Sequence, residues 1–262
     1  MGNSETRQPL KERIRLSESR RRETLEILSK GKSSKEVSAS DFAEQLFQRA
    51  PDKFLLGQSA ASLAETSRET LDFYLEYLKG KESTLVKVFN PESEEREGVS
   101  ILLSAISDRP FVVDTVAEYL GVMGINTSVF LHPIFQSKDG NLTSIIYVEL
   151  EKIEDQKQHQ EIEKKLNSIL EDLIVATEDF REIRAKGQEL SSQMAAVEGE
   201  DSEELSQLLR WVAEGGFVFL GYQSSKSPKK GSKIKAIDSL GLFRSSNPEI
   251  KNTLQDLSLI HI

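Results

Sequence analysis

The sequence predicts an α+β protein in which an antiparallel sheet is covered by helices, with a helical segment before it and the start of a second α+β module after it. Three observations lead to this fold class. Residues 98–133 have the pattern of a strand, a tight turn, a helix and a second strand. Strand-like apolar segments at 85–90 and 142–150 flank that stretch. Residues 162–174 then repeat apolar side chains with the period of a helix.

The stretch 98–133 organises the rest of the chain. Between residues 99 and 107 both alternating faces are mostly apolar, which is typical of a strand covered on both sides. We expect Asp108 to cap the next helix, with Pro110 in its first turn, where the missing N–H costs nothing. The apolar stripe of that helix consists of Val112, Val116, Tyr119, Leu120 and Met123. Gly121 and Gly124 are expected to end it before a strand at 125–131.

The neighbouring segments complete a sheet. The strand at 85–90 is closed by Pro91 and a charged loop, and we expect it to form a hairpin with 99–107. Residues 137–141 form a turn that returns the chain as the strand 142–150, and the clearest helix of the sequence comes next. The order is strand, strand, helix, strand, strand, helix. It predicts the ACT-like, ferredoxin-related arrangement of an antiparallel sheet with two helices on one side.

The chain before this sheet is expected to hold two parts. Residues 1–39 form a basic, partly disordered arm and linker, and residues 40–80 form a helical prelude that packs against the ACT-like domain. In the prelude we expect Asp41 to cap a short helix that stops near Ala50, before Pro51. A longer helix is predicted from about residue 59 to residue 78.

The chain after the first ACT-like domain (81–176) is predicted to begin a second one. Residues 177–200 are a helical connector, and residues 201–256 are the start of a second ACT-like module that is not completed. Its helix should turn Leu205, Leu208, Leu209 and Val212 inward. A strand at 217–223 comes next, with a basic turn and an expected hairpin partner at 233–237.

Composition limits the class of protein. The chain of 262 residues has 37% hydrophobic and 29% charged residues, no cysteine, and no apolar run near the roughly 18 residues of a membrane span. These features favour a cytoplasmic protein with no disulfide framework and no thiolate metal site. The net charge is −9, but residues 1–35 carry ten Lys and Arg against five Asp and Glu, so that arm is +5 and the remainder −14. A basic arm can touch nucleic acid, but a helix with a solvated face is the better interpretation.

Short motifs resemble a known family. DRPFVVDTV followed by HPIF, then TEDFREIR (177–184), GGFVFLGYQ (215–223) and LGLFR (240–244), occur in the order found in the N-terminal part of the large bacterial NAD-specific glutamate dehydrogenases. The resemblance covers residues 80–256. It implies an N-terminal ACT-like region, with NAD and the catalytic domain of the parent enzyme far downstream. For that parent it implies oxidation of glutamate to 2-oxoglutarate and ammonia.

The residues themselves predict no catalytic, cofactor-binding or metal site in this chain. It has no G-x-G-x-x-G and no Walker A sequence, and its three histidines are scattered. One ligand site is predicted at the turn after residue 107. There Arg109 and helix N–H groups would hold an amino-acid carboxylate, and Asp108 or Asp114 would face the ammonium group. The alternative is that these three residues only cap and pair locally. His132 is a further candidate, with a turn-holding role before Pro133 as its alternative.

Three functions compete. The first is a non-catalytic regulatory and assembly segment of a glutamate dehydrogenase-like enzyme, which associates with itself and with the C-terminal catalytic region and takes an amino-acid effector. The second is a free-standing amino-acid sensor of the ACT-like class. The third is a purely structural oligomerisation module. Neither nucleic acid nor a membrane is expected as a partner.

The last six residues, 257–262, are expected to be foreign to the protein. They read LSLIHI and bring apolar side chains to the terminus with no cap, turn or partner element. LSLIHI is also the translation of CTGTCTCTTATACACATC, a transposon end sequence used in preparing sequencing libraries. We therefore expect a gene fragment that was read through into adapter DNA.

Overall fold

The computed structural model describes residues 9–30, 37–199, 201–225 and 236–257. The predictions for the first residues of the arm, most of the linker, the basic turn and residues 258–262 lie outside these ranges. The chain divides into two compact units, Met1–Leu170 and Glu171–Ile262.

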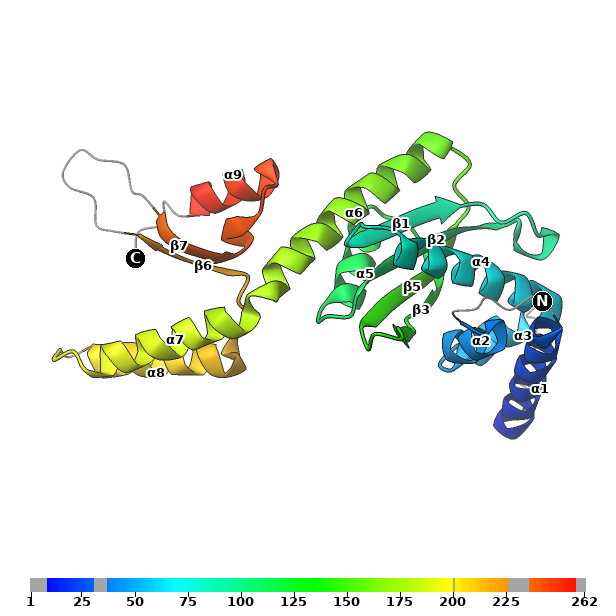
Figure 1. Cartoon of the computed structure of the whole chain (residues 1–262), viewed down its shortest axis with the longest axis horizontal. Helices are drawn as coiled ribbons and strands as arrows, with labels where there is room; N and C mark the ends of the chain where they lie inside the picture. Colours follow the sequence, from blue (N-terminus) through cyan, green and yellow to red (C-terminus); the bar gives the residue numbers. More distant parts are fainter. Residues whose placement is uncertain (1–8, 31–36, 200, 226–235, 258–262) are drawn as a thin grey trace, which may run out of the picture. The chain divides into compact units, whose positions relative to one another are not determined.

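A five-stranded antiparallel sheet forms the centre of the first unit (Figure 1). Its strands are β1 (Thr84–Phe89), β2 (Val99–Ser107), β3 (Thr127–Leu131), β4 (Ile134–Gln136) and β5 (Leu142–Glu151). The order is β1-β2-β5-β3, and β4 also pairs with β5. β2 and β5 are therefore central, which agrees with the apolar residues on both of their faces. This sheet and its helices confirm the predicted ACT-like α+β fold, with β4 as an addition to the predicted strands.

Two helices cover one face of the sheet. They are α5 (Val112–Val122) and α6 (Gln156–Glu178), the helices predicted at these positions. Alternate residues of the central strands are buried on this face, among them Leu102, Ile106, Ile146 and Val148. Two hydrogen bonds fix α6 to the edge strand: the Val88 N–H donates to Glu163 at 2.8 Å, and the Thr84 hydroxyl donates to Asn167 at 2.8 Å.

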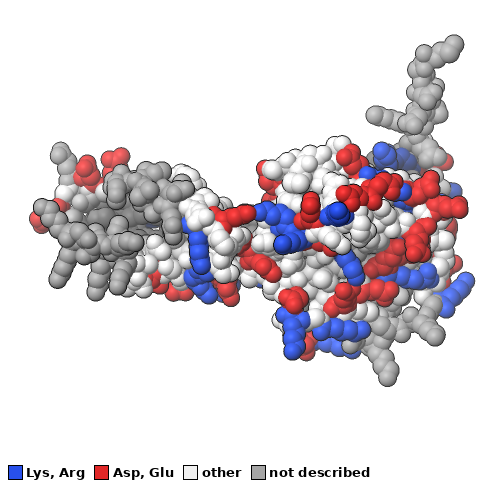
Figure 2. Space-filling model, turned by 90° about the horizontal axis from the view of Figure 1, so that it is seen from above, with Lys and Arg blue, Asp and Glu red and all other residues white. Residues whose placement is uncertain are grey.

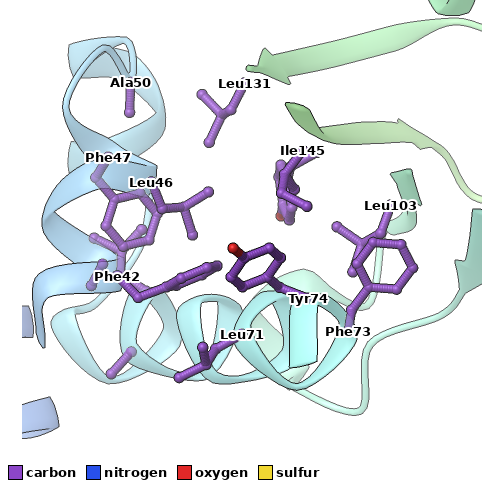
Figure 3. Close-up of a cluster of buried hydrophobic side chains, with 14 of the residues drawn as sticks. Phe42, Leu46, Phe47, Ala50, Leu71, Phe73, Tyr74, Leu103, Leu131 and Ile145 are labelled. Carbon is purple, nitrogen blue, oxygen red and sulfur yellow. The ribbon is translucent and has the colours of Figure 1, made fainter. Parts of the chain in front are cut away.

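The helical prelude covers the other face. It comprises α2 (Ala39–Phe47), α3 (Asp52–Leu56) and α4 (Ala60–Lys79), and α1 (Leu10–Ser29), from the segment predicted as a basic arm, packs on these three helices. Figure 3 shows Phe42, Leu46 and Phe47 of α2 and Tyr74 of α4 pointing toward Ile145 and its neighbours on the sheet. The rings of Phe42 and Phe135 stack with centroids 4.3 Å apart. The first unit therefore has three layers, because β2 and β5 offer a second apolar face that must also be buried.

One predicted cap is wrong in the prelude. The side chain of Ser38 accepts the N–H of Asp41, so α2 starts three residues earlier than predicted and Asp41 lies in its first turn. A serine hydroxyl that precedes the first turn serves this role as well as a carboxylate does. The predicted start of α4 near residue 59 is correct, and the side chain of Ser59 caps that helix.

The second unit contains the helices α7 (Phe180–Ala195), α8 (Ser202–Trp211) and α9 (Pro248–Leu257) and a hairpin of β6 (Gly221–Ser225) and β7 (Ala236–Gly241). The segment predicted as a connector holds α7, which packs on α8 through small residues. The Ser191 hydroxyl donates to the Ser206 carbonyl at 2.8 Å, and the Ser206 hydroxyl donates back to the Ser191 carbonyl at 2.9 Å. Such close packing needs side chains no larger than serine or alanine at the contact.

The predicted inward face of α8 is therefore wrong in part. Leu205 and Leu208 are 44% and 51% exposed, Leu209 and Val212 are half-buried, and Ser206 is buried against α7. The apolar period of the sequence was correct for a helix, but it did not identify the face that the helix buries.

Three of the family motifs meet in this unit. The carboxylate of Asp179, from TEDFREIR, accepts the N–H of Gly241 at 2.9 Å and an N–H of Arg244 at 2.6 Å, both from LGLFR. The Arg184 side chain donates to the carbonyl of Ala213 at 2.8 Å, just before GGFVFLGYQ. The pKa of Asp179 is lowered, mainly by the hydrogen bond from the Gly241 N–H and to a smaller extent by the bond and charge of Arg244.

The surface is mixed in charge. Figure 2 shows acidic and basic side chains interspersed over the face in view. In the described ranges, no helix is both long enough and apolar enough to cross a membrane.

Candidate functional site

The turn after β2 differs from the prediction. Asp108 does not cap α5: that helix begins at Val112, and its N-cap is Phe111, with a φ of 69° and no side-chain cap. The carboxylate of Asp108 instead accepts the hydroxyl of Ser144 on β5 at 2.6 Å, and its N–H donates to the Leu142 carbonyl at 2.8 Å. The neighbouring strand thus holds Asp108 four residues before the first residue of the helix, where its oxygen cannot reach the first-turn N–H groups.

Ser144 connects two of the predicted site residues. Its oxygen lies 3.1 Å from Nε2 of His132. Because Ser144 donates its only proton to Asp108, its oxygen accepts a hydrogen bond from the Nε2–H of His132. Burial lowers the pKa of His132, although the nearby Asp108 charge acts in the opposite direction. The serine is bound to the carboxylate and not to a basic nitrogen, so this chain of three groups does not activate a nucleophile.

The other two predicted residues have local roles. Arg109 folds back on its own strand, where Nε donates to the carbonyl of Ser107 at 3.1 Å and the guanidinium also bonds the Ser107 hydroxyl. Asp114 is exposed in the first turn of α5. The structure therefore joins Asp108 to His132 through Ser144. Among the described residues, no hydrogen bond joins Asp114 to them.

A cavity of about 380 Å³ opens beside His132. Gln45 of α2 and Arg49, just after that helix, line it together with the segment from Phe130 to Ile134. Arg49 supplies a positive charge at this cavity, and no acidic residue is among its lining residues. This cavity can accept an anionic group.

A second cavity, of about 350 Å³, was not predicted. Its lining includes Arg96, from the charged loop between β1 and β2, and Glu149 of β5. The side chain of Arg96 is 1% exposed and binds Glu69 through two hydrogen bonds of 2.7 and 3.0 Å, with Glu65 at 3.2 Å. The sequence held a signal for Glu149, because it interrupts the otherwise apolar end of LTSIIYVEL.

Glu149 is held by donors from three elements. One oxygen accepts the Tyr147 hydroxyl at 3.1 Å and the amide of Gln58 at 3.4 Å, and the other accepts the Ser128 hydroxyl at 3.3 Å. Only 8% of the residue is exposed. Burial raises the pKa of Glu149 above its ordinary value of 4.5, in spite of these hydrogen bonds and the Arg96 charge. Burial and the Glu149 charge together raise the pKa of Tyr147 as well.

The acidic residues do not form a metal centre. Within the ranges that the structure describes, no three or more His, Asp or Glu side chains gather where they could hold a metal ion.

Known proteins resemble this chain. Residues 42–166 match the family model described as "Glutamate dehydrogenase, ACT1 domain". The chain is 27% identical over 164 residues to an NAD-specific glutamate dehydrogenase of Pseudomonas aeruginosa, with 53% of this chain and 10% of that protein covered. It is 22% identical over 205 residues to an NAD-specific glutamate dehydrogenase of Halomonas elongata, with 66% of this chain and 13% of that protein covered. These matches confirm the resemblance predicted from the motifs: residues 42–166 are similar to the ACT1 domain of glutamate dehydrogenases, and the chain spans about a tenth of the length of the NAD-specific relatives that it matches.

Proposed function

We propose that the chain is a regulatory and assembly segment of an NAD-dependent glutamate dehydrogenase. The match of residues 42–166 to the ACT1 domain carries this proposal. The parent enzyme would convert L-glutamate, NAD and water to 2-oxoglutarate, ammonia and NADH. Catalytic residues and NAD would belong to another part of that cytoplasmic protein, because the matched segment spans about a tenth of the relatives.

The proposed mechanism is a shift between conformations of the assembled enzyme. An effector that binds one conformation better than another shifts the balance between them by that difference in affinity. Amino acids are the proposed effectors, and a second copy of this chain together with the catalytic region are the proposed partners. The two cavities of the first unit support the proposal, since each has buried or half-buried polar groups at its wall.

The experiment uses the purified chain. With glutamate and NAD it should form no NADH above the blank, and calorimetry against the twenty L-amino acids should detect at least one ligand. Sedimentation should show self-association that this ligand changes. Glutamate-dependent NADH formation would overturn the non-catalytic role. Ligand binding without any self-association would favour a free-standing sensor, and self-association without any ligand would favour a structural module.

A further inference from the structure

Carboxylates outnumber cations in the cluster around Arg96 and the cavity beside Glu149. Lys53, Arg96, Glu95 and Glu149 line the cavity, and the carboxylates of Glu65 and Glu69, which do not line it, bind Arg96. Arg96 is already bound to two of these carboxylates. Burying a carboxylate away from water is unfavourable, and without a cation nearby most of that cost is not offset. A positive group from outside would therefore stabilise this cluster.

Glu149 is positioned to take that positive group. Its three hydrogen-bond donors, Tyr147, Gln58 and Ser128, are neutral, and no described cation lies within ion-pair distance of it. An ionised carboxylate has about four acceptor sites, so at least one remains for a ligand. The fixed orientation of the carboxylate means that little side-chain freedom is lost when a ligand binds.

Arg96 supplies the opposite charge at the same cavity. The residue is 2% exposed, and its Nε–H has no hydrogen-bond acceptor among the described residues. Lys53 is exposed at the cavity wall and adds a second cation. The apolar side chains of Phe54, Val99 and Val129 line the remainder of the cavity.

We propose that this cavity binds a small zwitterion of the α-amino acid class, with its ammonium group on Glu149 and its carboxylate toward Arg96 Nε–H and Lys53. A volume of about 350 Å³ lies in the range of small-molecule sites, roughly 300–1,000 Å³. A simple anion would be repelled by Glu149. The cavity beside His132 has no acidic residue in its lining to hold an ammonium group. The site thus differs from the predicted turn around Asp108.

The inference rests on the proposed effector role for the class of ligand, but the two can fail separately. Failure of the proposed function appears as NADH formation by the chain or as an oligomeric state that no ligand changes. Failure of the inference appears as amino-acid binding that does not depend on Glu149.

The test is calorimetry with each of the twenty L-amino acids on the whole chain and on three variants. Glu149→Gln keeps the size of the side chain and removes its charge, and should weaken binding about tenfold or more. Glu151→Gln is the matched control on the same strand, where the side chain bonds exposed Asn126, and should change affinity less than twofold. Lys53→Ala should weaken binding about two- to fivefold, as for an exposed ion pair. The 2-oxo acid and the amine that match the bound amino acid should both bind more weakly than it does.

The location of binding is read independently by amide chemical shifts. Shifts of Gly57, Gly98 and Ser128 on ligand addition support the proposal, and they decide the matter even if Glu149→Gln fails to fold. Three results would overturn it: equal affinity of Glu149→Gln and the unsubstituted chain, shifts confined to the surroundings of His132, or no binding of any amino acid at millimolar concentration.

Discussion

Substitution of Arg96 by methionine is expected to destabilise the first unit by about 2–3 kcal/mol. Loss of one partner from a buried ion pair costs about 3–5 kcal/mol when the other partner stays buried. The side chain of Arg96 is 1% exposed, but those of its partners Glu69 and Glu65 are 26% and 42% exposed. Both carboxylates can therefore regain water after the substitution, which places the expected cost at or below the lower end of that range. Methionine keeps the apolar stem, so little of the loss comes from packing.

The assay must report on the first unit alone. Four of the five tyrosines (Tyr74, Tyr77, Tyr119 and Tyr147) belong to the first unit, whereas Tyr222 and Trp211 belong to residues 171–262. Urea unfolding is therefore followed by near-ultraviolet circular dichroism of tyrosine in a background that carries Trp211→Phe and Tyr222→Phe. The midpoint of thermal unfolding should fall by about 5–10 °C for a domain of this size.

Two further variants separate charge from geometry. Arg96→Lys keeps the positive charge but cannot form the two parallel bonds to Glu69, and should cost about 1–2 kcal/mol. Arg68→Met is the matched control, because Arg68 lies exposed on the same helix as Glu69, and should stay within about 0.5 kcal/mol. A loss below about 1 kcal/mol for Arg96→Met, or equal losses for Arg96→Met and Arg96→Lys, would refute the reasoning.

The remaining predictions concern three other positions. Asp108→Ala removes the acceptor of the buried Ser144 hydroxyl and should lower the free energy of unfolding by about 1 kcal/mol in urea titrations; no change would mean that the bond is worth nothing. Gly241→Ala should destabilise the second unit far more than Gly124→Ala does the first, as measured by tryptophan and tyrosine signals respectively. Both glycines have positive φ, but a Cβ at 241 would lie 2.5 Å from the Leu220 carbonyl oxygen, whereas a Cβ at 124 meets no atom within 4 Å. Burial raises the pKa of Glu149, so the folded chain holds this proton at a higher pH than the unfolded chain does. The free energy of unfolding of the unsubstituted chain should therefore fall relative to that of Glu149→Gln as pH rises above 4.5 and through the raised pKa. A difference in free energy that does not change with pH would contradict this.

The sequence by itself determined the sheet and its first pair of helices. The spacing of apolar residues can be read from each segment alone. It predicts strands at 99–107 and 142–150 and a helix at 162–174, and each of these has an apolar face that must pack against another element. The short spacing between these segments then leaves few ways to connect them, which favours the antiparallel order. The family resemblance also came from the sequence, since DRPFVVDTV and its companion motifs are contiguous in the chain.

Local information was not sufficient for the caps, the buried face of α8 or the candidate sites. Asp108 looked like an N-cap by its position before Pro110, but the hydroxyl of Ser144, 36 residues later, competes for its carboxylate. The stripe with Leu205 and Leu208 looked like a buried face, but the serine–serine bonds placed the adjacent side of α8, with Ser206, against α7.

Only the tertiary structure could bring Arg96 and Glu149 to one cavity. The two residues stand on different elements and 53 positions apart, and neither belongs to a motif. Their burial results from the prelude, which closes over the second face of the sheet and removes water from a carboxylate at the end of an apolar strand. The pKa of Glu149 and the pairing of Arg96 depend on the groups that surround them in space. These groups come from distant segments of the chain, so the sequence neighbours of the two residues do not reveal them.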